Sequence, residues 1–422
     1  GLGDDGASSS AVVIGGGLVG IEACEALVLS EIKVTLVEMA PQILPFLDPE
    51  LAMLAENYCR ARGIEVFTER SAARFIGEGG HVTGLELDNG TVIPCDCAII
   101  AIGVTPNVSL ARNAGLAIGP AGGITVDRFM QTSDPRIYAA GDCVEVPHFL
   151  RGTTVHAPFG DMANIEGRVA GENAACGNRA EFYGTIGTGI CKIFDYAAGI
   201  TGLSEKAARA AGFSDIVTSI SAGGDKPFFM NAKSVITKVA ADNRTGRIIG
   251  VQCVGDGDIA KELSLWSTAI KGGLTIDDMT GADLPYAPPF SPALGMSVIA
   301  AEVTQNKRRG LFTGIAAAEV KNRIDAGERL FMLDVRSAGE FRDLRLGIGE
   351  VLIPLDELRR RIDEIPSDRD AEIICYCKVA QRGYEASRIL RGMGWTTVKV
   401  MEGGINAWPY GYIEKGGTAP VT

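Results

Sequence analysis

The feature that most constrains this chain of 422 residues is a glycine-rich turn, G-x-G-x-x-G, at residues 15–20. A β-branched run at 11–14 precedes it and predicts a strand, and a helical pattern follows it as far as residue 29. A strand, a glycine-rich turn and a helix in this order are typical of a βαβ unit that binds a dinucleotide. The chain is therefore expected to begin with a parallel α/β domain.

Each glycine of the turn has its own predicted role. Gly15 makes the tight turn, Gly17 lets the backbone approach a pyrophosphate, and Gly20 allows the helix to pack closely on the strand. Glu38 follows the second predicted strand, 33–37, and would accept hydrogen bonds from a ribose diol. None of the three residues directly after Glu38 is Arg or Lys, and this favours NAD over NADP. We expect a Rossmann-type NAD-binding domain; the alternative is a tight βαβ turn that binds nothing.

The composition narrows the class of protein. Hydrophobic residues make up 46% of the chain, so a large core is expected, and the formal net charge of −12 argues against nucleic acid or an anionic membrane as the main partner. No apolar run approaches the ~18 residues of a membrane span. Ten Cys without a C-x-x-C pair and three His argue against a metal site and favour reduced thiols in a cytoplasmic protein.

Changes in pattern along the chain predict several domains. The nucleotide-binding domain covers residues 11–107 and includes a small antiparallel meander, and an α+β domain rich in β-branched strands covers 184–303. The polar, basic segment 304–312 predicts a linker to a second α/β unit at 313–422. Residues 1–10 resemble a linker and lack an initiating Met, so we expect the sequence to enter a longer or processed protein part-way.

Three more segments carry predictions about local structure. Residues 98–102 are expected to form a buried strand, and residues 355–365 a helix. Residues 284–290, LPYAPPF, contain too many prolines for a helix or a central strand and predict an ordered loop or an interface.

The stretch 132–142, TSDPRIYAAGD, predicts a short buried strand at 137–140 that ends at Gly141 and Asp142. In open α/β sheets, ligands bind at the carboxyl ends of strands. A Gly-Asp pair there would let the backbone approach a ligand and offer an acceptor to a hydroxyl group. The alternative is a strand followed by an ordinary turn Asp.

A second candidate site begins at Cys377, which ends a predicted strand, 373–377, and is followed by a loop and a helix at 383–391. Loop N–H groups would converge on the sulfur, the helix N-terminus would add positive potential, and Lys378 and Arg382 would add charge. Such a setting favours a thiolate and holds an anion or a persulfide. The alternative is an inert buried Cys beside an exposed Arg.

The C-terminal residues resemble a rhodanese domain. The resemblance is carried by the motifs LDVR, EF, C-x4-R, EGG and a single Trp, at residues 333–336, 340–341, 377–382, 402–404 and 408. It implies that Cys377 carries a persulfide and that Arg382 binds its anion. The chain departs from the family's pattern in a turn that is shortened at residues 347–350.

Residues 11–303 resemble the pyridine nucleotide-disulfide oxidoreductases, and among them the coenzyme A disulfide reductases and NADH oxidases that carry a C-terminal rhodanese domain. The dinucleotide fingerprint, the GVTPN segment that begins at Gly103 and the motif T-x4-I-Y-A-A-G-D carry this resemblance. It implies that Asp142, beside Gly141, bonds the ribityl chain of FAD, and that residues 108–183 are the returning part of an FAD-binding domain.

The same resemblance implies roles for two residues outside these motifs. Glu22 would lie near the contact of nicotinamide and flavin, although it could equally be a solvated helix acid. Tyr286 would be presented to the active site by the partner subunit of a homodimer formed through 184–303, although it could equally be a packing residue. The chain has no redox C-x4-C pair and no His-Pro motif. The family's N-terminal FAD half-domain and its redox Cys are also absent from this sequence.

Together these features predict an NADH- and FAD-dependent reductase of disulfides, coenzyme A persulfides or polysulfides, in which Cys377 carries sulfane sulfur. Three alternatives remain: a rhodanese sulfurtransferase on a non-redox NAD-binding scaffold, an NAD-binding sensor without turnover, and an NADH oxidase. The expected small-molecule partner is a sulfur compound of the coenzyme A or polysulfide class.

Overall fold

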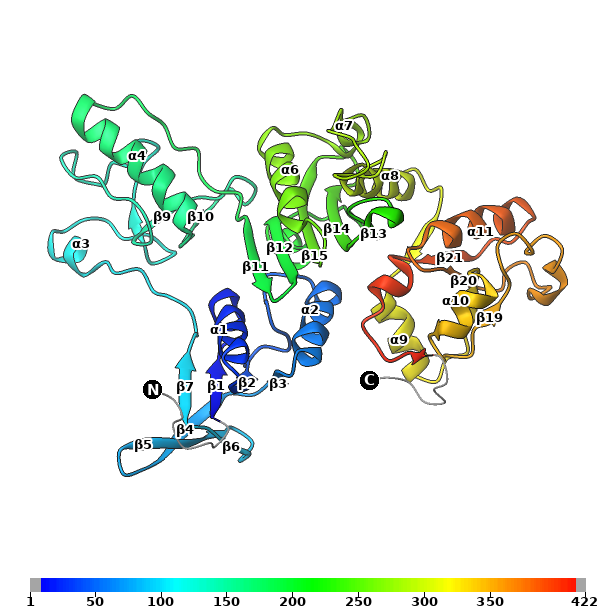
Figure 1. The fold of residues 1–422 in the computed structure, drawn as a ribbon. Coiled ribbons are helices and arrows are strands. Elements are labelled where there is room, and N and C mark those ends of the chain that lie inside the picture. The colour runs from blue at the N-terminus through cyan, green and yellow to red at the C-terminus, as the bar shows by residue number, and fades with distance from the viewer. Residues whose placement is uncertain (1–8, 415–422) are drawn as a thin grey trace.

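The computed structural model describes residues 9–414 and arranges them as four units, visible as successive colours in Figure 1. The predicted linker 1–10 therefore lies mostly outside the described residues, and Ser10 already belongs to the first strand. No helix within residues 9–414 is long and apolar enough to span a membrane.

The first unit is built on a parallel sheet of strand order β3-β2-β1-β7. The central strand β1 (Ser10–Ile14) pairs with β2 (Lys33–Val37) and with β7 (Cys97–Ile100), as the glycine-rich turn predicts for a Rossmann-type domain. The helices and the remaining strands of the unit are α1 (Leu18–Leu29), α2 (Pro49–Ala61), β3 (Glu65–Phe67), β4 (Ala72–Glu78), β5 (His81–Leu87) and β6 (Val92–Pro94).

The prediction of a buried strand at 98–102 is wrong in its burial. The strand exists as β7, but it lies at the edge of the sheet, so Ile100 is 60% exposed and Ile102, which follows it, is 75% exposed. A run of apolar residues identifies a strand without showing which of its sides will be covered.

The second unit is a small, loop-rich region with one long helix. Its elements are α3 (Ser109–Asn113), β8 (Ile124–Thr125), β9 (Val144–Pro147), β10 (Thr154–Val155) and α4 (Gly160–Cys176). The predicted strand at 137–140 is wrong: the segment makes only an isolated bridge between Gln131 and Tyr138, and Ile137 is 36% exposed. A strand needs a continuous neighbour to pair with, and the segment has none among the described residues.

The third unit is an antiparallel sheet of order β11-β12-β15-β14-β13 with helices packed on it. Its elements are β11 (Gly189–Ile193), β12 (Tyr196–Gly202), α5 (Glu205–Ala210), β13 (Ile216–Gly224), η1 (Phe228–Met230), β14 (Ser234–Asp242), β15 (Ile248–Gly255), α6 (Ile259–Lys271), α7 (Ile276–Thr280) and α8 (Met296–Arg308). Residues 304–308, predicted as the start of a linker, are instead the end of α8. The buried Thr304 hydroxyl bonds Ser219 of β13 at 2.7 Å and thereby holds this end on the sheet.

The fourth unit is a second parallel sheet, of order β16-β21-β20-β17-β19. Its elements are β16 (Thr313–Ile315), α9 (Ala317–Asp325), β17 (Phe331–Asp334), α10 (Ala338–Asp343), β18 (Leu344–Arg345), β19 (Val351–Leu352), η2 (Ile362–Glu364), β20 (Ile373–Tyr376), α11 (Gln381–Gly392), β21 (Val398–Met401), η3 (Gly404–Ala407) and β22 (Ile413–Glu414). The predicted helix at 355–365 is wrong, because these residues form turns and the short η2, with bonds such as Leu358 N–H to the Leu355 carbonyl oxygen.

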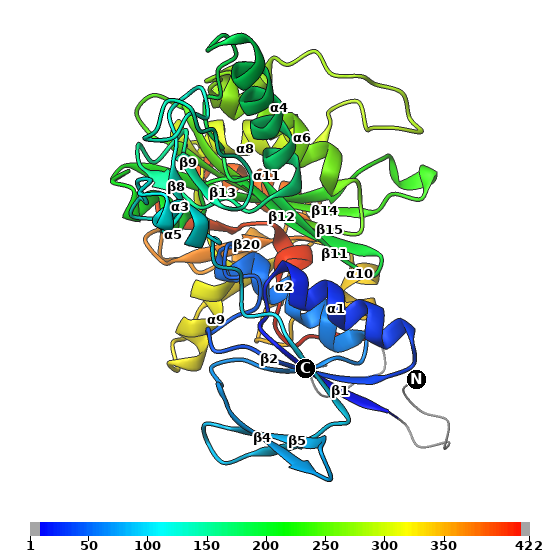
Figure 2. The ribbon, with the colours of Figure 1, turned by 90° about the vertical axis from the view of Figure 1, so that its left-hand side faces the viewer.

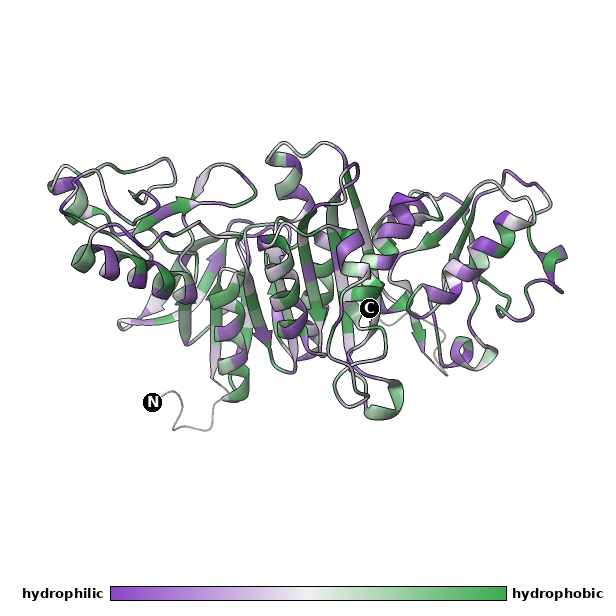
Figure 3. Ribbon diagram, turned by 90° about the horizontal axis from the view of Figure 1, so that it is seen from above, coloured by the Kyte–Doolittle hydropathy of each residue, from purple (hydrophilic) through white to green (hydrophobic). Residues whose placement is uncertain are grey.

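The helices α1 and α2 lie between the parallel sheet of the first unit and the antiparallel sheet of the third (Figure 2). One hydrophobic cluster runs through this junction and includes Leu51 of α2 and Ile236 of β14. Hydrophobic residues concentrate on the strands of these layers, while the helices mix hydrophobic and hydrophilic positions (Figure 3). The first and third units therefore share a core and hold each other in place.

Candidate functional site

The glycine-rich turn joins β1 to α1, and its three fingerprint glycines differ in their surroundings. At Gly15, φ is +108° and a Cβ atom would lie 2.3 Å from the Ala101 carbonyl oxygen. A Cβ atom on Gly20 would lie 1.8 Å from the Gly15 carbonyl oxygen, whereas one on Gly17 would have no neighbour within 4 Å. Packing therefore requires glycine at positions 15 and 20, while Gly17 has the open side that the predicted approach to a pyrophosphate needs.

Glu38 follows β2 and is only 8% exposed. Its Oε2 atom accepts a hydrogen bond from the Gly16 N–H at 2.6 Å, and its Oε1 atom accepts one from the Ala40 N–H at 2.7 Å. The carboxylate thus already holds the backbone beside the fingerprint. Each carboxylate oxygen can accept a second hydrogen bond, so the predicted contact with ribose hydroxyls stays a prediction that this geometry permits.

Two other residues predicted for the cofactor site are exposed. Glu22 lies on α1. Burial raises the pKa of the Cys191 thiol in β11, and the negative charge of Glu22 raises it further. Gly103 follows β7 with φ of +101°. Glu25, on the same helix as Glu22, is buried and accepts a hydrogen bond from the Phe194 N–H at 2.7 Å, so it ties α1 to the antiparallel domain.

The Gly141–Asp142 turn is held by two residues that sequence reasoning missed. Gly141 has φ of +82°, and its N–H donates to Oε2 of the buried Glu166 at 2.8 Å. Burial raises the pKa of Glu166. The ring nitrogen Nε2 of His156 lies 2.8 Å from the Asp142 carbonyl oxygen and would donate to it. The Asp142 side chain is exposed, so its carboxylate can accept hydrogen bonds from the hydroxyl groups of a ligand.

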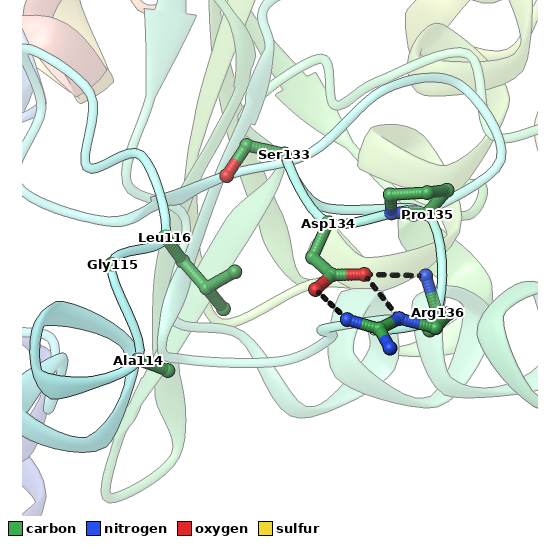
Figure 4. Close-up of a pocket in the computed structure, with 7 residues that line it drawn as sticks. All are labelled: Ala114, Gly115, Leu116, Ser133, Asp134, Pro135 and Arg136. Atoms are coloured by element: carbon green, nitrogen blue, oxygen red, sulfur yellow. Dashed lines mark hydrogen bonds and ion pairs between the residues drawn. The ribbon is translucent and has the colours of Figure 1, made fainter.

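A surface hollow of about 360 Å³ lies beside the Asp134-Pro135 turn (Figure 4). The Asp134 carboxylate accepts hydrogen bonds from the Arg136 backbone at 2.9 Å and from its guanidinium at 2.9 and 3.2 Å. The remaining wall comes from the segment after α3 and includes Leu116. The two charged groups of this hollow thus pair with each other and stabilise the turn.

Cys377 is fully buried at the carboxyl end of β20 and belongs to the same core cluster as Cys375. Burial raises the pKa of Cys375, which is a core thiol as its position one pleat earlier suggests. The loop that follows Cys377 ends at Ala380, whose φ of +75° marks the N-cap of α11. Within residues 9–414, the N–H groups of residues 378–380 donate to no protein acceptor, so they are free to bind an anion.

Arg382 lies in the first turn of α11 and forms a two-pronged ion pair with Glu340 of α10. The Arg382 Nη1 and Nη2 atoms donate to Glu340 Oε2 and Oε1 at 2.8 and 2.6 Å. This pairing lowers the pKa of Glu340 to about 2, and Glu340 and Cys377 both act to raise the pKa of Arg382. Arg382 is therefore held by a fixed carboxylate and lies close enough to Cys377 for that group to favour its charged form, so its predicted role as an anion-binding partner stays a prediction.

The remaining predicted site residues do not join this cluster. Lys378 is exposed on the loop that follows Cys377, so it adds positive charge to the surface of this loop. Tyr286 is 58% exposed in the Pro-rich loop, which contains neither helix nor strand from 284 to 290, as predicted. The loop projects from the antiparallel domain (Figure 2), so the predicted role of Tyr286 in a partner's site stays a prediction.

Three family models match parts of this chain. A family model described as pyridine nucleotide-disulphide oxidoreductase matches residues 2–158, its dimerisation domain matches 188–298, and the rhodanese-like domain matches 316–409. The solved structure of an NAD-dependent persulfide reductase from A. fulgidus is 42% identical with a TM-score of 0.89, over 95% of this chain and 72% of that chain.

The chain belongs to the pyridine nucleotide-disulphide oxidoreductases that carry a dimerisation domain and a rhodanese-like domain. Reduced CoADR-RHD from Bacillus anthracis is similar too, at 34% identity and a TM-score of 0.86, over 94% of this chain and 70% of that one. This family depends on FAD and a nicotinamide dinucleotide. The family thus accounts for both the glycine-rich turn and the Cys377 loop.

Two curated relatives show how much of such a protein this chain spans. An NADH oxidase from Methanocaldococcus jannaschii is 35% identical over 280 residues, which are 66% of this chain and 61% of that protein. A CoA-dependent NAD(P)H sulfur oxidoreductase from Pyrococcus furiosus is 34% identical over 294 residues, or 69% of this chain and 65% of the relative. The chain spans less than two thirds of the length of these relatives.

Proposed function

We propose that this chain is part of an NADH- and FAD-dependent reductase of sulfur compounds, namely disulfides, coenzyme A persulfides or polysulfides. The observation that carries the proposal is the placement of Cys377 beside Arg382 and unpaired loop N–H groups, in a chain that also holds an open dinucleotide fingerprint. The names of the similar persulfide reductase and sulfur oxidoreductase support the same substrate class.

In this proposal the first unit binds NAD(H). The backbone at Gly17 would face the pyrophosphate. Glu38 would accept hydrogen bonds from the ribose hydroxyls while its Oε2 atom keeps the bond from the Gly16 N–H at 2.6 Å. When bound, FAD would accept a hydride from NADH and pass electrons on to sulfur. Asp142 would accept a hydrogen bond from a hydroxyl group of the ribityl chain of FAD, and Gly141 would let the backbone approach that chain. Glu22 would lie near the nicotinamide ring.

Cys377 has the role of a sulfur carrier. Its thiolate would attack a sulfane sulfur, a new S–S bond would form, and the donor's leaving group would depart with the electron pair of the broken bond. The N–H groups of residues 378–380 and the Arg382 guanidinium would hold the terminal persulfide sulfur as an anion. Lys378 would attract anionic donors to the loop.

We also propose a homodimer through the antiparallel domain, with boundaries at 11–107, 108–183, 184–303 and 313–422 for the four units. The dimerisation-domain match at 188–298 supports this assembly. Tyr286 would reach the partner's active site, and its exposed position on a projecting loop suits that role.

The experiment that tests the reductase proposal is NADH oxidation by the purified chain with FAD and a coenzyme A persulfide or polysulfide. The proposal expects oxidation that depends on the sulfur acceptor, and a visible absorption spectrum with flavin bands. A colourless protein that binds NADH but never oxidises it would contradict the reductase proposal for this chain.

A second candidate function is sulfur transfer without redox chemistry, on an NAD-binding scaffold. The exposure of the Asp142 side chain favours it, because no hydrogen bond or ion pair within residues 9–414 engages that carboxylate. Thiosulfate-dependent sulfur transfer without NADH oxidation would support it. NADH oxidation that proceeds with oxygen and no sulfur compound would instead favour an NADH oxidase, the name of the relative from Methanocaldococcus jannaschii.

A further inference from the structure

The rhodanese-like domain covers an edge of the antiparallel sheet. The edge strand is β13, since the sheet order ends β14-β13. At an antiparallel edge, every second residue turns its N–H away from the sheet and needs an acceptor when it is buried. The N–H of Ile220, 5% exposed, is such a group, and it donates at 3.0 Å to Oε2 of Glu402 from the rhodanese-like domain.

Glu402 is held from three directions. It directly follows β21, and its own N–H donates to the Ile315 carbonyl oxygen of β16 at 3.0 Å. Its Oε1 atom pairs with Nζ of Lys307, in the last turn of α8. Glu402 is 5% exposed, so this carboxylate lies inside the junction of the two domains and satisfies one donor from the sheet and one from the helix that leads into the rhodanese-like domain.

The two glycines after Glu402 connect this junction to the Cys377 loop. Gly403 has φ of +70°, and a Cβ atom there would lie 3.0 Å from Cγ2 of Ile220. Gly404 has φ of +60°, and its Cβ atom would lie 2.3 Å from the Cys377 carbonyl oxygen and 2.7 Å from that of Lys378. One glycine therefore touches the antiparallel domain while the next touches the loop.

The short helix η3 completes the connection. The N–H of Ile405 donates to the Cys377 carbonyl oxygen at 3.0 Å, and the N–H of Asn406 donates to the Lys378 carbonyl oxygen at 3.0 Å. Val379 of the loop packs against the hydrophobic cluster that contains Ile220 and runs through the first and third units. The carbonyl oxygens of Cys377 and Lys378 are thus fixed by η3, while the loop N–H groups stay without a protein acceptor within residues 9–414.

We propose that Glu402 is a positioning residue that couples the docking of the rhodanese-like domain on β13 to the geometry of the Cys377 loop. The inference rests on the proposed sulfur-carrier role of Cys377 and deepens it. Glu402 does not touch the sulfur. It acts through Gly403, Gly404 and the backbone bonds of η3, so the loop has its active form only when the domain is seated on the antiparallel sheet.

The test compares Glu402→Ala and Glu402→Gln with the full-length chain. Two quantities are measured: kcat and KM for thiosulfate-to-cyanide sulfur transfer, and the alkylation rate of each Cys by iodoacetamide. We expect Glu402→Ala to lower kcat about tenfold, because misplaced loop donors act weakly. The alkylation rate of Cys377 should rise about fivefold as the loop opens locally. The amide of Glu402→Gln keeps an acceptor for Ile220 and should restore most of both values.

Asn57→Ala is the matched control. Asn57 of α2 donates to the Pro409 carbonyl oxygen at 2.5 Å, so this variant removes another bond of the same domain junction without touching η3 or Glu402. It should leave both measurements unchanged. Cys375, buried in the same domain, reports general unfolding, and its alkylation should stay slow in all variants.

Lys307→Met removes the partner of Glu402 on α8. It should lower kcat and raise the alkylation rate of Cys377 by about threefold each. This variant carries the test if Glu402→Ala does not fold. Wild-type kinetics and Cys377 alkylation in both Lys307→Met and Glu402→Ala would overturn the proposal. Faster alkylation of Cys375 in parallel with Cys377, or an equal effect of Asn57→Ala, would also overturn it. A wild-type chain that transfers no sulfur would instead contradict the proposed function, and the alkylation rates would still decide the positioning role.

Discussion

The Cys377 loop and the Gly141–Asp142 turn look alike in sequence, because in each a short apolar run predicts a strand that ends at one candidate reactive or ligand-binding side chain. In the structure they differ in how completely they are enclosed. The Cys377 side chain is buried and its loop is held by η3, whereas the Asp142 side chain is exposed. The comparison teaches that similar local patterns can end in very different surroundings, with the Cys377 thiol enclosed by its own domain and the Asp142 carboxylate open to solvent.

The largest effect is expected when Cys377, the proposed sulfur nucleophile, is removed. Cys377→Ser should lower sulfur transfer from thiosulfate to cyanide by roughly a thousandfold, because a Ser hydroxyl cannot carry a persulfide. NADH affinity, measured by fluorescence, should not change, since the fingerprint lies in another unit. Cys375→Ser is the matched control and should keep most of the activity; a larger loss there than in Cys377→Ser would reverse the two assignments.

The glycine-rich turn offers the next largest effect. Gly20→Ala places a Cβ atom 1.8 Å from the Gly15 carbonyl oxygen, so the free energy of unfolding should fall by about 2 kcal/mol, as in an overpacked core. Gly17→Ala meets open space and should keep its stability while it loses NADH affinity. Urea unfolding and NADH titration separate the two outcomes. Equal stability of both variants would contradict the packing assigned to Gly20.

Glu38 should show a smaller effect, because it serves the backbone and the cofactor together. Glu38→Gln keeps one acceptor but loses charge, and we expect about a tenfold weaker affinity for NADH. Its affinity for NADPH should fall less, since the ribose phosphate no longer meets a carboxylate. A titration with both nucleotides checks this, and an unchanged preference would show that Glu38 only holds the turn.

The smallest expected effect is a pH dependence that separates the two regions. Burial lowers the pKa of His148, in the unit that contains Asp142, from 6.5 to about 4. The unfolded chain therefore takes up a proton first as the pH falls below 6.5, and stability should decrease by about 1 kcal/mol between pH 7 and about pH 5.7. His148→Asn should remove this part of the pH dependence in urea unfolding.

Glu340 in the sulfur site behaves in the opposite way. Its pKa is lowered to about 2 by Arg382, so its contribution is complete above its ordinary value of 4.5 and is lost only as the pH falls toward 2. Acidification from pH 7 to pH 5 should therefore weaken the unit of Asp142 and spare the sulfur site. Loss of sulfur transfer over the same range as loss of stability would contradict this separation.

Local features of the sequence predicted much of the fold. The strand β2 (Lys33–Val37) has the predicted bounds, because a run of β-branched and apolar residues with flanking turn residues is a local signal. The strand at 137–140 failed because pairing depends on a neighbour elsewhere in the chain. The end of α8 was taken for a linker because its polar, basic residues hid the burial of Thr304.

The same division applies to the candidate site. The glycines of the fingerprint and the run from Cys377 to Arg382 are contiguous, so their roles follow from a motif. The pairs that hold these elements are distant: Gly141 with Glu166 spans 25 positions, Arg382 with Glu340 spans 42, and Ile220 with Glu402 spans 182. Only the folded chain brings such residues together, which is why sequence reasoning missed the residues that support the candidate site.

The most direct test of the central claim, that the sulfur site is complete in this chain, is to look for the persulfide itself. The purified chain is treated with thiosulfate, without NADH or FAD, then digested and examined by mass spectrometry. The account predicts the mass of one added sulfur atom on the peptide that contains Cys377, with sulfite released in equal amount. No added sulfur on that peptide, or equal addition to other Cys peptides, would contradict it.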